Sequence, residues 1–381
     1  MRGVSPYSGD LYEAIMEESA AGGECQVTVM DFASAMPGAL YPGGRLSQGC
    51  AGREIAWWNP FSWLRVASGP QSVVHLQYWT FVLSPYFLLI AFFCRIKGKR
   101  VVVTLHNPAA HENLWVFDFT ERIFLKLADV LIVHGERGRG SLYRRFGSSL
   151  KARTCVVPHG VSDSAPVKFG RDAALILLDL PRDCRCICMF GNLRGYKGVD
   201  ILLAAWSEIE EDFPDVTLVI AGRLWGESRG LRGFVSRILG LGKEAEKIRK
   251  ALALPRPGRV KLVNGFIADK EIDALISVSE FAVFPYKKFS SQSGAASRAA
   301  GHGCPVLVSD VGELPTLAIA DDWIVDPGDI TGLAVAMRSH LVCSKNLRDA
   351  QRKKVASFSW RRVAKAHLDV YAGAASGRWR T

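Results

Sequence analysis

Short apolar runs recur along the chain, and most are followed by a segment in which apolar residues return every three or four positions. Such runs are typical of buried strands, and the longer spacing is typical of helices. An alternation of the two predicts an α/β fold with parallel sheets. The strands are predicted over residues 73–76, 100–105, 130–134, 154–157, 186–190, 217–221, 260–264, 282–284 and 305–309.

One apolar run is too long for a strand. Residues 79–94 contain no charged residue, and a basic run follows at 95–100. A helix that crosses a bilayer needs about 20 apolar residues, so this run, with Pro85 inside it, is too short. We expect a buried helix that connects two strands. A segment that dips into a membrane is the alternative, and the basic run would suit an anionic leaflet.

The stretch at 189–205, MFGNLRGYKGVDILLAA, carries the first chemical signal. An apolar strand runs into Gly191, a short turn follows, and then a helix begins. The first N–H groups of a helix have no partner inside it, and the helix dipole adds to their attraction for anions. Arg194 and Lys197 add positive charge to the turn. This favours a diphosphate-binding turn, although an ordinary turn with two solvated cations has the same composition.

A second stretch, at 283–315, has the sequence VFPYKKFSSQSGAASRAAGHGCPVLVSDVGELP. A strand ends at Pro285, and a helix of small residues begins near Gly294 after Ser, Gln and Ser, so it also offers unpaired N–H groups. Together the two stretches resemble the donor half of the retaining GT-B glycosyltransferases of family four. There G-x-L-x-x-x-K-G-x-x-x-L is followed by P-(S/Y)-x(n)-G-x-P-V-x-x-(S/D)-x-x-G. The resemblance covers most of the chain.

The resemblance implies the GT-B architecture, in which two Rossmann-like domains face each other across a cleft and a C-terminal helix crosses back to the first domain. We expect an acceptor-side domain at 1–165, a nucleotide-sugar-binding domain at 166–358, and the crossing helix and tail at 359–381.

Family members open with a strand and a glycine turn. Residues 3–5 fit that turn, and residues 11–21 and 27–32 fit the helix and the strand that come after it. The first strand would therefore lie upstream of Met1. We expect either a start that is placed too far downstream or a truncated chain.

The reaction that the resemblance implies moves a sugar from a nucleotide-sugar donor to a lipid-linked or polysaccharide acceptor with retention of configuration. No metal and no cofactor are expected, and no D-x-D motif occurs. The resemblance also implies that the leaving phosphate itself can take the proton of the acceptor hydroxyl, so a protein nucleophile is not obligatory. Negative charge that develops on the diphosphate would be stabilised by Arg194, Lys197 and backbone N–H groups.

His106 ends a predicted strand and, by the same resemblance, would face the transferred sugar. The alternative is a strand-end histidine held by a backbone group, and His159 in the P-H-G-V corner is expected to be of that structural kind. The catalytic candidates are thus His106, Arg194 and Lys197. The donor-binding candidates are Gly191, Asn192, Arg223, Gly265, Phe266, Ile267, Ser290, Ser293, Gly294, Ala295 and Arg298, and Gly3 and His111 are expected on the acceptor side.

Two departures from the family pattern concern the donor. The positions of the family's glutamate pair, E-x7-E, hold Ser290 and Arg298. Ser290 can still hydrogen-bond a sugar hydroxyl, whereas Arg298 cannot accept a hydrogen bond from a ribose. The arginine of the family's G-R-L is Asn192 here, and Arg194 could supply that charge from two residues on.

Composition and net charge limit the kinds of partner that the protein is expected to bind. The chain of 381 residues is long enough for two domains, and 49% hydrophobic with 22% charged residues is typical of a globular protein. Its net charge of +11 indicates an anionic partner. A nucleotide-sugar and an anionic membrane surface both qualify, the latter through residues near Trp79 and 95–100. A nucleic acid is not expected, because the basic residues are scattered and no binding motif for one occurs.

The nine cysteines form no C-x-x-C pair, so a zinc site is not expected. Cys184, Cys186 and Cys188 lie two apart and would share one face of a strand as small apolar residues. Without a disulfide framework or a signal peptide, the expected location is the cytoplasm, with the inner membrane face as the place of any peripheral contact.

Two other functions are compatible with the same fold. A non-catalytic nucleotide-sugar-binding or partner subunit would bind the donor without turnover, and the lost glutamates and the missing first strand favour it. A GT-B epimerase that acts on a UDP-sugar would need carboxylates facing the sugar, and none is found. We therefore expect a glycosyltransferase of the hexosyltransferase type.

Overall fold

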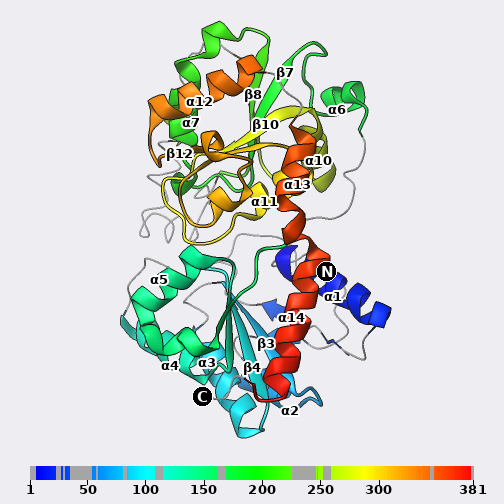
Figure 1. Ribbon diagram of the computed structural model, residues 1–381, viewed down its shortest axis with the longest axis vertical. Helices are drawn as coiled ribbons and strands as arrows, with labels where there is room; N and C mark the ends of the chain where they lie inside the picture. Colours follow the sequence, from blue (N-terminus) through cyan, green and yellow to red (C-terminus); the bar gives the residue numbers. More distant parts are fainter. Residues whose placement is uncertain are drawn as a thin grey trace. The chain divides into compact units, whose positions relative to one another are not determined.

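The computed structural model describes residues 6–22, 27–28, 31–34, 54–56, 59–79, 84–107, 115–161, 169–224, 246, 248–251, 259–343 and 347–378. The chain divides into two compact units. The first unit comprises Met1–Gly160, Ser290–Gln292 and Phe358–Thr381, and the second comprises Val161–Phe289 and Ser293–Ser357. Each unit is built around a parallel sheet with helices against it, as the alternating pattern predicted (Figure 1).

The main sheet of the first unit has four parallel strands in the order β3-β4-β5-β6. Alternate residues of β4 point to opposite faces: Val101 and Val103 belong to one apolar core, and Val102 belongs to the other. The sequence predicted all four strands to within two residues. Their bounds are β3 (Val73–Tyr78), β4 (Arg100–Leu105), β5 (Val130–Val133) and β6 (Thr154–Val156).

Different helices cover the two faces of this sheet. Helices α2, α3, α4 and α5 enclose the core that contains Val101 and Val103, and α1 and α14 pack on the face of Val102. Figure 1 shows α14, in red, beside α1, in blue. The bounds are α1 (Pro6–Gly22), α2 (Pro60–Ser68), α3 (Ser84–Ile96), α4 (Trp115–Leu127), α5 (Glu136–Phe146) and α14 (Trp360–Ala375).

The C-terminal helix belongs to the first unit, as the predicted fold class required. Ser359 caps α14 by accepting a hydrogen bond from the Arg362 N–H at 3.4 Å. A β-carbon on Gly160 would lie 2.2 Å from the Trp360 ring, so the corner that precedes residue 161 needs a glycine where the helix begins.

Two predicted elements lie elsewhere than expected. The strand predicted at 27–32 is displaced to β1 (Asp31–Ser34), which pairs in parallel with β2 (Glu54–Ala56). In the apolar run 79–94, residues 84–94 lie in α3 and residues 80–83 lie outside the described residues. Pro85 is in the first turn of α3, where a missing N–H costs no hydrogen bond. Of the helices that the structure describes, none is both long enough and apolar enough to cross a bilayer.

The second unit has a six-stranded parallel sheet in the order β12-β11-β10-β7-β8-β9. Every residue of β8 is buried, as expected for a strand covered on both faces. The bounds of its elements are α6 (Arg171–Leu177), β7 (Arg185–Phe190), α7 (Val199–Ser207), β8 (Val216–Gly222), β9 (Arg259–Asn264), α10 (Asp269–Val278), β10 (Ser279–Phe284), α11 (Gly294–Gly301), β11 (Val306–Ser309), β12 (Ile324–Val325), α12 (Ile330–Cys343) and α13 (Arg348–Val355).

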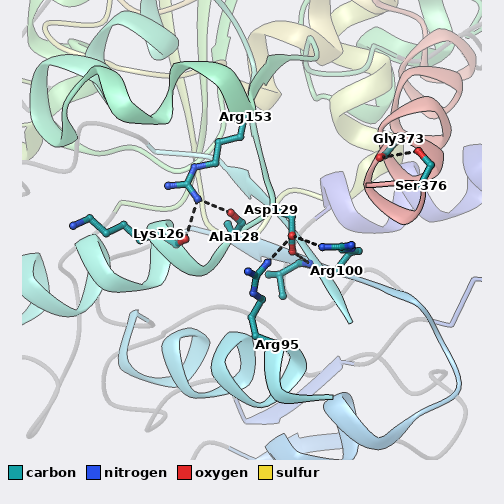
Figure 2. Close-up of polar contacts among 9 residues, drawn as sticks. Arg95, Arg100, Lys126, Ala128, Asp129, Arg153, Gly373 and Ser376 are labelled. Carbon is teal, nitrogen blue, oxygen red and sulfur yellow. Dashed lines mark hydrogen bonds and ion pairs between the residues drawn. The ribbon is translucent and has the colours of Figure 1, made fainter. Parts of the chain in front are cut away.

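One carboxylate joins three segments at the amino ends of β4 and β5. Asp129 accepts hydrogen bonds from Arg95 at 2.6 Å, from Arg100 at 3.2 Å and from the Val101 N–H at 2.8 Å (Figure 2). Arg153 closes the same region by donating to the carbonyl oxygens of Lys126 and Ala128, both at 2.9 Å. Much of the basic run at 95–100 therefore has a structural role.

We expect Asp129→Ala to lower the free energy of unfolding by roughly 2–4 kcal/mol. This is less than the loss of about 3–5 kcal/mol typical of a fully buried pair, because part of Arg95 lies in water. Urea unfolding of the first unit, monitored by hydrogen exchange, measures this loss. Glu136→Ala removes the exposed Glu136–Arg139 pair from the same unit and should cost less than about 1 kcal/mol. Equal losses in the two variants would contradict the role given to Asp129.

Candidate functional site

The strand order of the second sheet identifies one place for a ligand. From β7 the sheet is built outward through β8 and β9 on one side and through β10, β11 and β12 on the other. The loops after β7 and β10 therefore leave the sheet where the strand order reverses. Open α/β sheets bind ligands at such a point, at the carboxyl ends of the strands. Both stretches singled out in the sequence contain these loops.

Glycines allow the two loops to approach closely. Gly198 has a φ of 72°, and a β-carbon on it would lie 1.9 Å from the Pro285 carbonyl oxygen. A β-carbon on Gly222 would lie 1.8 Å from the Gly191 carbonyl oxygen. Any other residue at either position would push backbone segments apart. The start of α7 thus lies directly against the end of β10.

Lys197 is buried within this arrangement, with 8% of its surface exposed. A β-carbon built on Gly191 would lie 3.1 Å from Lys197 Nζ and 3.5 Å from the Ala295 β-carbon, so three predicted site residues converge. Lys197 Nζ lies 5.3 Å from the centre of the Tyr286 ring. Among the residues that the structure describes, no carboxylate forms an ion pair with Lys197. A buried ammonium group is costly without a negative charge nearby, and an anionic ligand would supply that charge.

Burial is the main influence on the Lys197 ammonium. It lowers the pKa of Lys197, Tyr196 opposes this effect, and the positive charge of Arg194 adds to it. An anion bound at this point would reverse the shift, because a negative neighbour favours the charged form. Lys197 is therefore not the solvated cation that the sequence left open as an alternative.

The start of α11 completes this part of the site. Ser293 caps the helix, accepting from the Ala296 N–H at 3.4 Å, and its hydroxyl lies 2.9 Å from the Tyr286 hydroxyl. Ala295, in the first turn of α11, is the residue that lies next to Gly191. The amino end of α11 therefore faces the glycine turn and Lys197. Tyr286, which positions Ser293, was not among the sequence candidates, although it is part of the second family motif.

Other predicted donor residues lie along the same edge. The Leu193 N–H donates to the Arg223 carbonyl at 2.8 Å, which places Asn192 and Arg194 beside the end of β8. The Gly265 N–H donates to the Gly222 carbonyl at 3.3 Å, and Phe266 follows with 92% of its surface exposed. An aromatic ring left so open at a strand end is available for stacking. Ile267 is half-buried in its loop. Ser290 belongs to the first unit, and its predicted contact with the donor remains a prediction.

Arg298 has protein partners. Its guanidinium forms ion pairs with Asp269 at 2.5 Å and Asp273 at 2.6 Å, which tie α11 to α10. These pairs raise the pKa of Arg298 against the effect of burial. Its predicted contact with the donor remains a prediction.

His106 lies at the carboxyl end of β4 in the first unit, buried between protein groups. Its Nε2 lies 2.7 Å from Gln77 Oε1, and its Nδ1 lies 3.1 Å from His134 Nε2. The Trp79 ring stacks on it with 3.5 Å between ring centres and 3° between planes. His106 is only 5% exposed, so a sugar could touch the imidazole only if Trp79 or Gln77 moved.

The sequence candidates did not include the residues that hold His106. Four consecutive parallel strands each carry one polar residue at or just beyond their ends, which brings these residues to one edge of the sheet: Gln77, His106, His134 and His159. The recurrence of a polar residue at the end of each predicted strand was the signal available in the sequence. Gly3 and His111, expected on the acceptor side, lie outside the described residues.

Five histidines of the first unit form a cluster, which we call the histidine cluster: His75, His106, His134, His159 and His367. Burial lowers the pKa of each, to about 4 for His159 and His367. Tyr7 of α1 packs against three of them, with ring centres 4.7 Å from His106, 5.1 Å from His134 and 5.0 Å from His159. All five are therefore neutral in the folded protein at neutral pH.

We expect the first unit to lose stability on mild acidification. A histidine whose folded pKa is lowered contributes stability above its unfolded pKa of about 6.5, and this is lost as the pH falls toward the folded value. Each such group lowers the unfolding free energy by about 1.4 kcal/mol per pH unit in that window. Hydrogen exchange at pH 7.5, 6 and 5 should show the first unit opening before the second. Equal protection of both units at pH 5 would contradict this.

Comparison with known proteins gives a consistent result. Residues 184–342 match the model of the family described as glycosyl transferases group 1. A D-inositol 3-phosphate glycosyltransferase of Mycolicibacterium smegmatis is 30% identical over 253 residues, which are 65% of this chain and 54% of that protein. A protein of the same name from Streptomyces avermitilis is 25% identical over 333 residues, 82% of this chain and 68% of that protein. The chain thus spans little more than half of the first relative.

Solved structures share the fold. HepE of Anabaena in complex with UDP aligns with a TM-score of 0.62 and 16% identity over 82% of each chain. A glycosyltransferase of Rickettsia africae aligns with a TM-score of 0.66 and 14% identity over 96% of this chain and 94% of that chain. At these identities the likeness concerns the fold alone. It confirms the predicted GT-B class, and the family match confirms the predicted resemblance.

Proposed function

Because residues 184–342 match the model of the glycosyl transferases group 1 family, we propose that this protein transfers a hexose from a nucleotide-sugar donor to an acceptor hydroxyl with retention of configuration. The observation that carries the proposal is the buried Lys197 ammonium, which lies beside the Gly191 turn and the start of α11 without a carboxylate partner among the described residues. These groups suit a diphosphate.

The chemistry follows from that position. As the bond between the anomeric carbon and the diphosphate oxygen breaks, negative charge grows on the leaving diphosphate. Lys197, Arg194 and the N–H groups at 294–295 would stabilise this charge more strongly in the transition state than in the bound donor. The acceptor oxygen attacks the same face of the sugar, and its proton passes to the leaving phosphate. No metal is required for these steps.

Other donor contacts belong to the same proposal. Phe266 and the backbone of Gly265 and Ile267 would hold the base, Asn192 and Arg223 would flank the phosphates, and Ser290 would bind a sugar hydroxyl. UDP-sugars are the first donors to test, since HepE and an E. coli trehalose-6-phosphate protein are described in complex with UDP or a UDP-sugar analogue. Domain boundaries at 165 and 358 remain part of the proposal.

The acceptor is proposed to be lipid-linked or part of a polysaccharide, in the cytoplasm at the inner membrane face. The relatives named D-inositol 3-phosphate glycosyltransferase add a phosphorylated cyclitol as an acceptor to test. Thermal stabilisation by UDP-, GDP- and ADP-sugars identifies the donor, because a ligand that binds the native state raises its stability. Stabilisation without turnover on every acceptor would favour the non-catalytic alternative.

We expect Lys197→Met to reduce turnover by about 10²-fold or more, the usual scale for the loss of one preorganised electrostatic contact. Lys197→Arg should not restore it fully, since a planar fork does not replace a compact ammonium. The free protein should be at least as stable as before, because Met fills the same space without burying a charge. The measurement is sugar transfer under saturating donor, together with thermal unfolding.

Lys261→Ala is the matched control, because Lys261 lies within β9 and pairs with Asp179. It should leave turnover within about twofold of wild type. Transfer within that same factor in Lys197→Met would end the phosphate-binding assignment. The anomer of the product tests retention, and transfer in the presence of EDTA tests independence of metal.

For the membrane contact, we correct one expectation from the sequence. Trp79 follows the carboxyl end of β3, whereas Arg100 begins β4 at the opposite end of the sheet, so the two cannot form one patch. Lys99 donates to the carbonyl oxygens of Gly69 and Gln71, and Arg95 and Arg100 bind Asp129. The apolar surface of α3 is the better candidate. We call it the α3 row: Leu89, Phe92 and Ile96, which are 40%, 47% and 63% exposed at helical spacing.

We expect Phe92→Ser with Ile96→Ser to weaken binding to phosphatidylglycerol vesicles at least tenfold, because each side chain would otherwise transfer apolar surface from water. Lys97→Gln should reduce the salt dependence, since exposed charges are screened within about 10 Å at 0.1 M. Vesicle sedimentation measures both. Val335→Ser, an exposed apolar residue of the second unit, is the control. Binding that is absent in wild type, or unchanged in the double variant, removes the membrane proposal.

A further inference from the structure

Two imidazoles of the first unit lie in series between two carbonyl oxygens. The Val157 carbonyl oxygen is 3.1 Å from His134 Nδ1, and His134 Nε2 is 3.1 Å from His106 Nδ1. His106 Nε2 is then 2.7 Å from Gln77 Oε1. Both ends of this chain are oxygens that can only accept hydrogen bonds.

The number of N–H protons shows what this series of hydrogen-bonded groups lacks. Its three contacts need three N–H groups, one for each hydrogen bond. Two neutral imidazoles carry only two, because each has one protonated and one unprotonated nitrogen. With the Gln77 amide oxygen facing His106, one contact in the neutral state therefore places two lone pairs against each other. Turning the amide would present its NH2 group to His106 but would remove that group from His75 Nε2, which lies 3.3 Å from it. One added proton completes all three bonds.

From this we propose that His106 and His134 form a single proton-binding site, and that it takes up a proton at a higher pH than the other members of the histidine cluster. The proton comes from a hydronium ion in the solvent, forms an N–H bond on one ring and leaves a water molecule behind. The inference does not depend on the proposed transfer reaction.

The other three histidines gain no hydrogen bond from a proton. His159 Nδ1 already donates to the Gly160 carbonyl at 2.8 Å, and His367 Nδ1 donates to that of Val363 at 2.8 Å. His75 lies between the hydroxyls of Tyr371 at 2.7 Å and Thr104 at 2.8 Å. A hydroxyl can donate or accept, so neutral His75 is already satisfied.

Opposing effects act on the pair. The ionisable groups that face it are His75 of β3, His159 after β6, His367 of α14 and Tyr7 of α1, and none supplies a negative charge at neutral pH. Burial, together with the neighbouring His159 and His367, lowers the pKa of His134 to about 3 although its hydrogen bond to Val157 opposes this, and the pKa of His159 is lowered to about 4. We infer that the completed chain reverses this order.

Two interactions support the reversal. A buried donor or acceptor left without its hydrogen bond is destabilising, and the added proton removes that cost. Trp79, stacked on His106, presents its electron-rich face to the imidazolium, which favours the charged ring. Burial keeps the midpoint below the ordinary value for histidine.

Gln77 and His134 are positioning residues in this scheme. In the charged state both nitrogens of His106 are donors with fixed acceptors, so the ring has one orientation beneath Trp79. In the neutral state one contact is repulsive, and the ring or the Gln77 amide is free to turn. Mild acidification would therefore hold His106 at the carboxyl end of β4 more firmly.

The test is a pH titration of the full chain with ¹⁵N-labelled histidine, followed by ring ¹⁵N shifts between pH 8 and 4.5. His106 and His134 should shift with one common midpoint, above the midpoints of His159 and His367. Gln77→Leu removes one terminal acceptor, so two neutral rings satisfy every remaining contact. The midpoint should then fall by roughly one pH unit, a tenfold loss of proton affinity.

Gln77→Glu provides an independent variant, because a carboxylate at the same position should raise the midpoint by one pH unit or more. It also keeps the proposal testable if Gln77→Leu does not fold. His159→Gln is the control and should leave the common midpoint in place. The proposal is overturned if His106 and His134 titrate separately, if they titrate after His159 and His367, or if both Gln77 variants leave their midpoint unchanged.

Discussion

One ammonium group in the second unit is buried with no carboxylate paired to it among the residues that the structure describes, and the proposed site depends on this constraint. Lys197 reaches its position because the backbone at Gly198 passes against the Pro285 carbonyl, a contact that no β-carbon would allow. The same approach places the start of α11 against the Gly191 turn. A protein that only needed stability would neutralise or expose such a lysine, since an uncompensated buried charge is costly. The proposed function would explain its retention, because a bound diphosphate would bring the missing negative charge.

The first unit uses the opposite electrostatic arrangement at its own strand ends. Polar side chains from consecutive strands meet there, yet they are imidazoles, an amide and hydroxyls in place of a carboxylate. The edge can therefore be buried under Tyr7 and Trp79 in an uncharged form. At the other end of the sheet charge is concentrated around Asp129, where arginines tie α3 to β4 and β5.

Arg298 shows how a departure from a family pattern is accommodated. Arginine stands where relatives carry a glutamate, and Asp269 and Asp273 of α10 neutralise it. Arg298 thereby ties α11 to α10. Whether the donor meets Arg298 or these carboxylates is decided by side-chain direction, which spacing in the sequence does not encode.

The sequence by itself determined the strands, their parallel pairing and the two loops that carry the donor motifs, because a fully buried strand and a glycine turn leave patterns over a few adjacent residues. It did not determine where α3 begins within an apolar run, because a helix that packs on one face and a helix that is fully buried have similar compositions. The exposed α3 row became visible only from the structure. Nor did it reveal the burial of Lys197 or the series Gln77–His106–His134, which unite residues from separate strands. Charge state and burial depend on neighbours distant in the chain, and only tertiary packing decides which neighbours those are.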